Sequence, residues 1–189
     1  MAERPRIEGY AVISREGMIA ASDGSFPDAI KIPADHEFYQ AAVDRASAVV
    51  NGAHSAEGGP KEKERRRLRL TRRATQLIPD PKNPNALLWN PAMAPFDEAW
   101  RRLGIGAADT LAVVGGTDVF ALFLGIGYDA FYLTRTEGSV PKGRPVFPGV
   151  GRDGVTAGAV MSKFDLVLKG TRMLDAATNT FVEEWGPKP

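Results

Sequence analysis

The sequence predicts a single α/β domain built on a mostly parallel sheet that ends in an antiparallel pair of strands. Short apolar segments typical of buried strands alternate with segments whose apolar residues recur at helical spacing. The last two segments alternate apolar and polar residues, as the strands of a hairpin do. A chain of 189 residues is long enough for one well-buried core and too short for two. We therefore expect one domain over residues 1–189, with its core over about residues 7–186.

Eight strands are expected. The first is an apolar run that opens the domain, and the fifth is apolar throughout, which is typical of a strand buried on both faces. The third alternates apolar and basic residues, as an edge strand does. The predicted strands span residues 10–14, 48–51, 68–71, 86–89, 110–114, 130–136, 164–173 and 179–185.

Helices are expected between several of these strands. The first has apolar residues at helical spacing, and Pro33 together with the acid Asp35 marks its start. The segments 16–33 and 145–160 contain several glycines and prolines, so both are predicted to be loops. Long ordered loops in compact domains are often functional. The predicted helices span residues 34–47, 96–103 and 117–125.

The charge of the chain is balanced overall but uneven along its length. Lys and Arg total 24 and Asp and Glu total 23, so the whole molecule is not suited to bind a polyanion and no nucleic-acid partner is expected. Residues 61–73, however, contain eight basic and two acidic residues. We call this segment the basic run; it predicts local attraction for an anion.

Composition excludes several kinds of site. The chain has no cysteine and only two histidines, so it cannot form disulfides, thiolate nucleophiles or cysteine-ligated metal sites, and no metal is expected. The most apolar window, residues 111–128, is interrupted by Gly115, Gly116 and Asp118 and cannot cross a membrane. The polar N-terminal residues lack the apolar core of a signal peptide. A cytoplasmic protein with no membrane partner is expected.

Three short motifs suggest binding of phosphate groups. Gly115-Gly116 follows a buried strand and precedes a helix, which places free backbone amides at a helix N-terminus; a tight strand–helix turn is the alternative. The segment Gly52–Ser55 has a glycine, a histidine and a hydroxyl after a strand and could hold a pyrophosphate, or Ser55 could simply cap a helix. Arg72-Arg73 suits a phosphate monoester such as the 2′-phosphate of NADP, although charge runs are commonly solvated faces.

Asp35 is the carboxylate with the strongest context. It lies in the first turn of the first predicted helix, after a loop and before the apolar face of that helix. An acid in this position could bind a cationic or amidine-like heterocycle. The alternative is an ordinary acidic residue that stabilises the start of the helix.

Together and in this order, these motifs resemble the dihydrofolate reductase superfamily, which includes the dihydrofolate reductases and the reductase domain of bacterial riboflavin biosynthesis. The most specific part of the likeness is the segment from Val113 to Pro148. It contains Val113–Phe120, then Phe123-Leu124, then Tyr132–Thr134 and finally Val146–Pro148. Further likeness is found in the segments Tyr10–Ala20, Ile32–Asp35 and Val49–Ser55.

The resemblance implies an eight-stranded, mostly parallel sheet flanked by helices, with NADPH bound across the strand ends. It also implies a cis peptide bond between Gly115 and Gly116. The residues that would face the cofactor are Ala11, Ile19, Gly52, His54, Ser55, Thr71, Arg72, Arg73, Val114, Gly115, Gly116, Thr117, Asp118 and Val119.

For the substrate, the resemblance implies that Asp35 is the catalytic acid that binds a pterin and that Thr134 supports it. His36, Tyr39 and Arg65 would be substrate-binding residues, Arg65 near the arginine that holds the glutamate of folate. The chain departs from the family at several points. The loop before Asp35 has no tryptophan, and His36, Ala53 and Phe120 stand where an apolar residue, an arginine and a tyrosine are usual. The Thr-x-x-x-Asp-Pro-x-Leu segment of the riboflavin reductases is also missing.

Three functions remain open from the sequence. The first is NADPH-dependent hydride transfer to a reduced pterin or folate-like heterocycle, a small-molecule substrate. The second is reduction of a ribosylated pyrimidine of the riboflavin pathway. The third is a non-catalytic module that binds a nucleotide or nucleic acid through the basic run. A monomer or a homodimer is expected.

Overall fold

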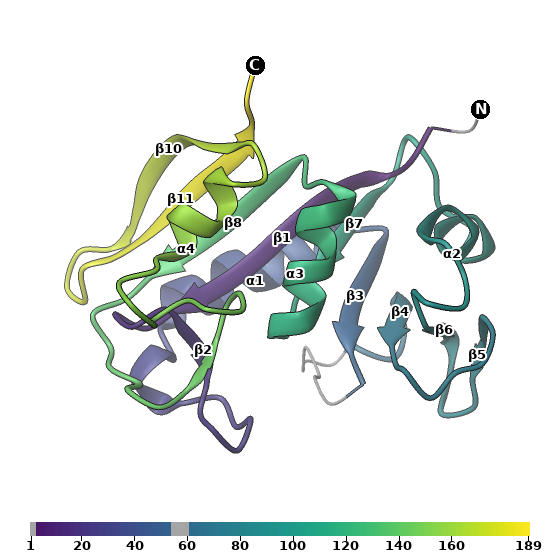
Figure 1. Cartoon of the computed structure of the whole chain (residues 1–189), viewed down its shortest axis with the longest axis horizontal. Helices are drawn as coiled ribbons and strands as arrows, with labels where there is room; N and C mark the ends of the chain where they lie inside the picture. Colours follow the sequence, from purple (N-terminus) through teal and green to yellow (C-terminus); the bar gives the residue numbers. More distant parts are fainter. Residues whose placement is uncertain (1–2, 54–60) are drawn as a thin grey trace.

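The computed structural model describes residues 3–53 and 61–189. Within these residues, a nine-stranded sheet has the strand order β10-β11-β8-β1-β7-β3-β4-β6-β5 (Figure 1), and β2 pairs with β9 in a second, two-stranded sheet. The strands are β1 (Arg6–Ile13), β2 (Met18–Ala20), β3 (Ala48–Gly52), β4 (Arg66–Leu70), β5 (Ile78–Asp80), β6 (Asn83–Trp89), β7 (Thr110–Val113), β8 (Ala130–Arg135), β9 (Arg144–Pro145), β10 (Leu166–Asp175) and β11 (Thr180–Pro187).

The core of the large sheet is parallel. β1 lies between β7 and β8 and is parallel to both, and β3, β4 and β6 continue in the same direction on the far side of β7. The carboxyl ends of these strands therefore meet at one edge of the sheet. The edge strands are antiparallel: β5 pairs with β6, and the hairpin β10–β11 pairs through β11 with β8. The predicted α/β class with a closing antiparallel hairpin is confirmed.

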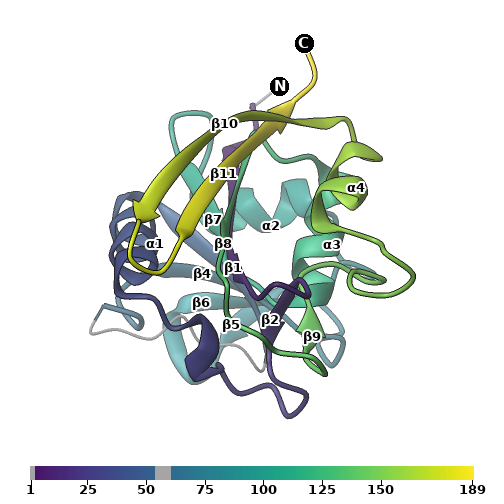
Figure 2. The same ribbon diagram turned by 90° about the vertical axis from the view of Figure 1, so that its left-hand side faces the viewer.

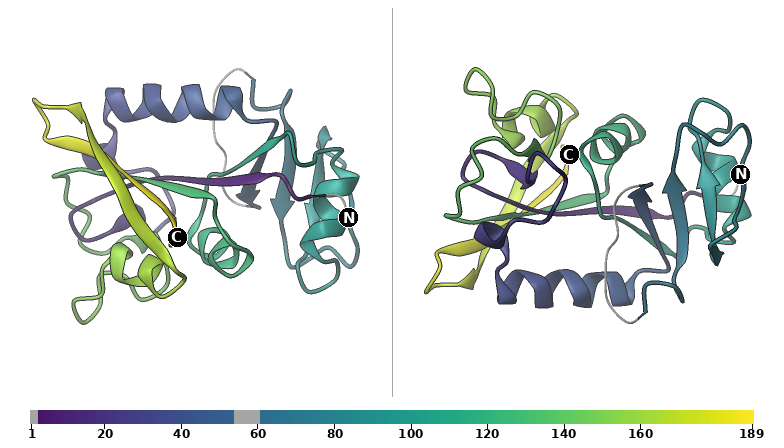
Figure 3. Two further views of the ribbon diagram at one scale, coloured as in Figure 1. Left: turned by 90° about the horizontal axis from the view of Figure 1, so that it is seen from above. Right: turned by 90° about the horizontal axis from the view of Figure 1, so that it is seen from below.

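Helices cover both faces of the sheet, as Figures 2 and 3 show. α1 lies on one face, and α3 and α4 lie on the other (Figure 3). The helices are α1 (Pro33–Arg45), α2 (Phe96–Arg102), α3 (Thr117–Ile126) and α4 (Ala157–Ser162), with a short 3-10 turn over Asp28–Ile30.

Each face of the sheet has its own apolar core. Beneath α3, aromatic rings pack edge to face, for example Phe120 against Phe131 with ring centroids 5.4 Å apart. Gly9 of β1 is required here, because a Cβ at this position would lie 2.3 Å from the Phe131 ring. Beneath α1, Val43 packs with apolar residues of the central strands. Buried on both faces, β3 and β7 are apolar for most of their length, as expected for parallel strands.

The structure contains elements that the sequence did not predict. β5 adds a ninth strand to the eight that were expected; it has three residues, one of them a proline, and is too short to show a strand period. The predicted loop 16–33 contains β2 and the 3-10 turn. β2 depends on pairing with a distant strand, since Met18 lies opposite Pro145, and such pairing leaves no local pattern.

The prediction that residues 145–160 form a connecting loop is wrong at its C-terminal end, where α4 begins. The Thr156 hydroxyl caps this helix by accepting a hydrogen bond from the Ala159 amide at 3.1 Å. Ala157 and Met161 are buried, and a Cβ on Gly158 would lie 3.0 Å from the Trp185 ring. A cap and packing against β11 therefore form a helix that is too short to show an apolar period.

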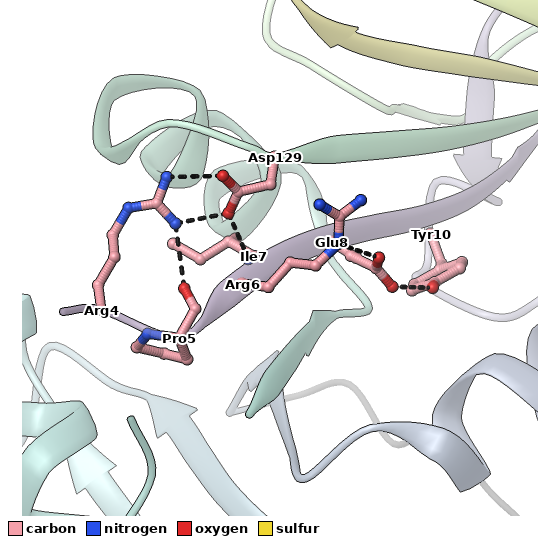
Figure 4. A network of polar contacts seen from close by, with 7 residues as sticks. All are labelled: Arg4, Pro5, Arg6, Ile7, Glu8, Tyr10 and Asp129. Atoms are coloured by element: carbon pink, nitrogen blue, oxygen red, sulfur yellow. Dashed lines mark hydrogen bonds and ion pairs between the residues drawn. The ribbon is translucent and has the colours of Figure 1, made fainter. Parts of the chain in front are cut away.

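Polar contacts fix the register of β1 at its N-terminal end (Figure 4). The Asp129 carboxylate accepts hydrogen bonds from the Arg4 guanidinium at 2.6 Å and from the Ile7 amide at 2.7 Å. The Glu8 carboxylate accepts from Arg6 at 2.7 Å and from the Tyr10 hydroxyl at 2.5 Å. β1 begins four residues before the apolar run that predicted it, because residues 6–9 pair with β7 and their polar side chains find hydrogen-bond partners.

Glu16 holds the turn between β1 and β2 against the segment that follows β8. Its carboxylate accepts hydrogen bonds from the Ser14 hydroxyl at 2.7 Å, the Ser139 hydroxyl at 2.7 Å and the Val140 amide at 2.8 Å. Desolvation tends to raise the pKa of Glu16, but these hydrogen bonds outweigh it and lower the pKa to about 2.

Replacing Glu16 with Gln should therefore reduce stability in a pH-dependent way. A carboxyl with a lowered folded-state pKa stabilises the protein above its unfolded pKa of about 4.3, and this stabilisation is lost as the pH falls towards 2. Thermal unfolding of the parent and Glu16→Gln should show a gap at neutral pH that closes on acidification. Glu137→Gln is the control: Glu137 lies in the segment that follows β8 and its exposed carboxylate accepts a hydrogen bond from Asn179 at 2.8 Å, so this variant should show a smaller gap. A Glu16→Gln gap that is independent of pH would contradict this account.

Candidate functional site

A cleft of about 1690 Å³ lies at the carboxyl ends of the parallel strands. Its walls are residues at the ends of β1, β3, β4 and β8, the first turns of α1 and α3, and the segment around β2. Crevices at this edge of open α/β sheets are common ligand sites. The volume exceeds that of a pocket for one drug-sized ligand, so there is room for two ligands side by side.

The structure brings most of the predicted site residues together in this cleft. Arg65 does not line it, because its guanidinium pairs with Asp44 of α1. His54 and Ser55 lie outside the described residues. The predicted residues that line the cleft are Ala11, Ile19, Asp35, His36, Tyr39, Gly52, Thr71, Arg72, Arg73, Val114, Gly115, Gly116, Thr117, Asp118, Val119 and Thr134.

Asp35 is buried at one end of the cleft. It stands in the first turn of α1 and is 8% exposed, and its carboxylate accepts a hydrogen bond from the hydroxyl of Thr134, which is 1% exposed. Burial raises the pKa of Asp35, and the Thr134 hydrogen bond and the nearby His36 only partly offset this. The side chain thus reaches across to β8, which favours a role at the cleft over that of an ordinary helix-start acid.

An aromatic wall lies next to Asp35. The rings of Tyr10 and Tyr132 stack with centroids 5.1 Å apart, and Phe38 meets Tyr132 edge-on at 5.8 Å. All three line the cleft. The Tyr10 hydroxyl donates a hydrogen bond to the Glu8 carboxylate (Figure 4), so the wall is positioned by a polar contact as well as by packing. This end of the cleft suits a flat heterocycle with a polar edge.

The Gly115-Gly116 turn lines the other part of the cleft. The peptide bond between the two glycines is cis, as the resemblance implies. The Gly115 carbonyl accepts a hydrogen bond from the Gly52 amide at 3.0 Å, which joins this turn to the end of β3. α3 begins directly after the turn, and the amides of its first turn favour an anion. Asp118 in the same turn is an acid that opposes this attraction.

The basic run is divided between the fold and the cleft. Arg72 and Arg73 are exposed and line the cleft. Four other arginines of the run contact the fold instead. They bind as follows: Arg65 to Asp44, Arg66 to the Gly104 carbonyl, Arg67 to Asn51 and Arg69 to Asp80. The run is therefore not one solvated face, which disfavours the nucleic-acid hypothesis.

Several cleft residues were missed by the sequence reasoning. Arg144, Lys31 and Phe26 line the mouth of the cleft, and Phe26 is 49% exposed. Arg144 reaches the cleft because β9 pairs with β2, where it lies opposite Ala20. No local pattern signals that pairing. Phe26, in contrast, could have been identified from the sequence, because it is an aromatic residue in the loop before Asp35, where the family usually has a tryptophan.

Two negative findings concern the described part of the chain. Among residues 3–53 and 61–189, no three His, Asp or Glu side chains are arranged to hold a metal ion. Over the same residues, none of the helices has the length and apolar character needed to cross a bilayer.

Comparison with solved structures shows which known fold this architecture matches. Dihydrofolate reductase from Enterococcus faecalis, solved with NADP(H), superposes with a TM-score of 0.65 at 15% identity over 98% of each chain. The chain has the dihydrofolate reductase-like fold. No protein-family model matches the sequence, and the search of curated proteins found no match.

Two further structures share the dihydrofolate reductase-like fold. The deaminase/reductase of Thermotoga maritima, which acts on a phosphoribosylaminopyrimidine and a phosphoribosylaminouracil, has a TM-score of 0.62 at 19% identity. It matches 97% of this chain, which spans only 57% of the Thermotoga protein. A protein of Shewanella sp., assigned provisionally to riboflavin biosynthesis, has a TM-score of 0.64 at 14% identity over the full length of both chains. At these identities the comparisons show the fold.

The burial of Asp35 predicts a pH-dependent effect of its replacement on stability. An acid whose folded-state pKa is raised contributes most stability below its unfolded pKa of about 3.9, and this contribution is lost as the pH rises through the folded pKa. Asn resembles the neutral carboxyl at every pH. The melting temperature of Asp35→Asn relative to the parent should therefore rise between acidic and neutral pH, by roughly 2–4 °C for each 1 kcal/mol.

The control for this measurement is Asp28→Asn. Lys31 lowers the pKa of the exposed Asp28, so any change should be small and should favour the parent as the pH rises. An Asp35→Asn difference that falls with rising pH would show that Asp35 is stabilised as a carboxylate, contrary to its burial.

Proposed function

We propose that the protein is an NADPH-dependent reductase that transfers a hydride to a reduced pterin or folate-like heterocycle. One observation carries the proposal. The buried Asp35–Thr134 pair and the Gly115-Gly116 turn with Arg72 and Arg73 line the same cleft. The first suits a heterocycle and the second suits phosphates, and hydride transfer requires both ligands to lie in contact.

The residues of the cofactor half fit a phosphorylated dinucleotide. Arg72 and Arg73 follow the end of β4 and line the cleft, and they would bind the 2′-phosphate, for which a guanidinium fork is well suited. Gly52 and Gly116 present backbone with no side chain. Gly115 has a φ of 113°, and a Cβ there would lie 3.2 Å from the Phe120 ring, so the turn requires glycine. When bound, NADPH supplies the hydride.

The residues of the substrate half fit an amidine-like edge. The Asp35 carboxylate can accept two hydrogen bonds from a ring N–H and an adjacent amino group. The aromatic wall of Tyr10, Tyr132 and Phe38 flanks this position with a flat apolar surface. Thr134 holds the carboxylate in place from β8.

Asp35 also has the properties of a proton donor or acceptor. Its raised pKa brings the proton-bound state closer to the working pH, where general acid–base catalysis is most effective. The residue would hold a proton at a carboxyl oxygen and support protonation of the substrate ring, directly or through a water molecule.

A second candidate is reduction of a ribosylated pyrimidine, as in riboflavin synthesis. Lys31 and Arg144 line the cleft and could meet a sugar phosphate attached to the heterocycle. The Thermotoga deaminase/reductase and the Shewanella protein, provisionally assigned to riboflavin biosynthesis, have the same fold as this chain. The pterin reading is preferred because of the buried acid and its threonine partner.

Arg72 and Arg73 predict a preference for NADPH over NADH. Each charge-assisted contact to the 2′-phosphate contributes roughly 1.5–3 kcal/mol, or about ten- to a hundredfold in Kd. Fluorescence titration should show this preference in the parent and its loss in Arg72→Ala and Arg73→Ala, with NADH affinity little changed. Arg101→Ala, which removes an exposed arginine from α2, is the matched control. Equal affinity of the parent for both cofactors would refute the assignment of the 2′-phosphate site.

Asp35→Asn should abolish turnover and leave the cofactor bound. The amide keeps the shape of the side chain but loses the charge that pairs with the protonated edge, so kcat/KM should fall by about a hundredfold or more. The assay follows NADPH oxidation with dihydrofolate, dihydrobiopterin and a riboflavin-pathway pyrimidine as substrates. NADPH Kd, measured on the same sample, should change less than about threefold.

The substrate that the parent accepts decides between the two reductase hypotheses. Activity on a pterin that survives in Asp35→Asn would remove Asp35 from the mechanism. Activity on the pyrimidine alone would favour the riboflavin-pathway function.

A further inference from the structure

A buried arginine stands behind the cofactor half of the cleft. Arg67 of β4 is 1% exposed, and its neighbour Asn51 at the end of β3 is fully buried. Neither residue lines the cleft. Burying an arginine costs free energy unless its N–H donors are hydrogen-bonded to acceptors. The acceptors of Arg67 therefore show which parts of the fold it holds in position.

A chain of hydrogen bonds leads from Arg67 to the Gly115-Gly116 turn. Arg67 Nη1 donates to Asn51 Oδ1 at 2.8 Å, and Asn51 Nδ2 donates to the Gly52 carbonyl at 3.0 Å. The Gly52 amide in turn donates to the Gly115 carbonyl at 3.0 Å. Gly52, Gly115 and Gly116 all line the cleft. The guanidinium is thus linked, through one amide side chain, to the two glycine turns of the cofactor half.

The same guanidinium also binds the segment that leads into β4. Arg67 Nη2 donates to the carbonyl of Glu62 at 3.2 Å. Asn51 and Glu62 lie at the two ends of the connection between β3 and β4. A planar guanidinium can hold two acceptors in a fixed relation, which the single ammonium of a lysine cannot do.

We propose that Arg67 is a positioning residue for cofactor binding: it fixes the ends of the β3–β4 connection and, through Asn51, the Gly52 and Gly115 backbone that the cofactor approaches. The inference rests on the proposed function for the identity of the ligand. The positioning itself is a property of the protein alone. It does not require Arg67 to touch the cofactor.

The test compares Arg67→Met and Arg67→Lys with Arg69→Met. Arg69 lies two residues further along β4, pairs with Asp80 at 3.0 Å and does not line the cleft. Its loss therefore affects the same strand but leaves the hydrogen bonds from Arg67 to Asn51 in place. Two quantities are measured for the full-length variants: hydrogen exchange of the Gly52 amide relative to the Thr71 amide, and the Kd of NADPH. Thr71 donates to the Trp89 carbonyl at the end of β4 and serves as the internal reference.

We expect Arg67→Met to speed Gly52 exchange by about tenfold relative to Thr71 and to weaken NADPH binding by about tenfold. Arg67→Lys, which retains the charge but has a single nitrogen in place of the planar fork, should give a smaller change in both quantities. KM for the second substrate at saturating NADPH should stay within about twofold, since the Asp35 end of the cleft is separate. Arg69→Met should lower the melting temperature without changing the exchange of Gly52 relative to Thr71 or the Kd of NADPH.

Equal effects of Arg67→Met and Arg69→Met on Gly52 exchange and on NADPH binding would overturn the inference, because Arg67 would then only stabilise the fold. If the parent binds no NADPH, the proposed function fails. Gly52 exchange then decides the positioning role by itself: selective acceleration in Arg67→Met supports it, and unchanged exchange refutes it.

Discussion

The parallel pairing of β1 with both β7 and β8 is the constraint on which the rest of the structure depends. Parallel strands that share a direction end at the same edge of the sheet, so residues from distant parts of the chain meet there. Asp129, just before β8, fixes the register of β1 at its other end through hydrogen bonds to Arg4 and to the Ile7 amide. A slip of one residue would turn the cleft-lining side chains of β1 to the opposite face.

The two halves of the cleft use buried polar groups in different ways. At one end, Asp35 itself lines the cleft, and its burial raises its pKa against the opposing effect of Thr134. Near the Gly115-Gly116 turn, the buried pair is Arg67–Asn51, which does not line the cleft and is hydrogen-bonded to the backbone of Gly52. A group that must react with a ligand remains accessible to it, whereas a group that sets geometry is best placed where packing holds it rigid.

The fold separates the arginines of the basic run, so that they do not form one continuous exposed face. Consecutive residues of β4 point to opposite faces of the sheet, so Arg66, which is exposed and binds the Gly104 carbonyl, is separated from the buried Arg67. Arg67 is buried and Arg69 pairs with Asp80, whereas Arg72 and Arg73 follow the end of the strand and reach the cleft. The net charge of a segment therefore overstated the charge that is available to a ligand.

The sequence by itself determined the α/β class and the positions of the eight main strands along the chain, because these depend on local apolar period. Glycine, acid and arginine positions near strand and helix ends indicated part of the candidate site, and the resemblance to the dihydrofolate reductase superfamily implied further site residues. Tertiary structure alone decided the rest. β5, β2, β9 and α4 are too short to carry a period. β2 and β9 form by pairing with each other from distant parts of the chain, and α4 packs against Trp185 of β11. Arg65 pairs with Asp44, Arg144 lines the cleft because β9 pairs with β2, and Arg67 is buried beside Asn51. These contacts are set by which elements lie next to each other in the fold, and long-range adjacency is not encoded in local spacing.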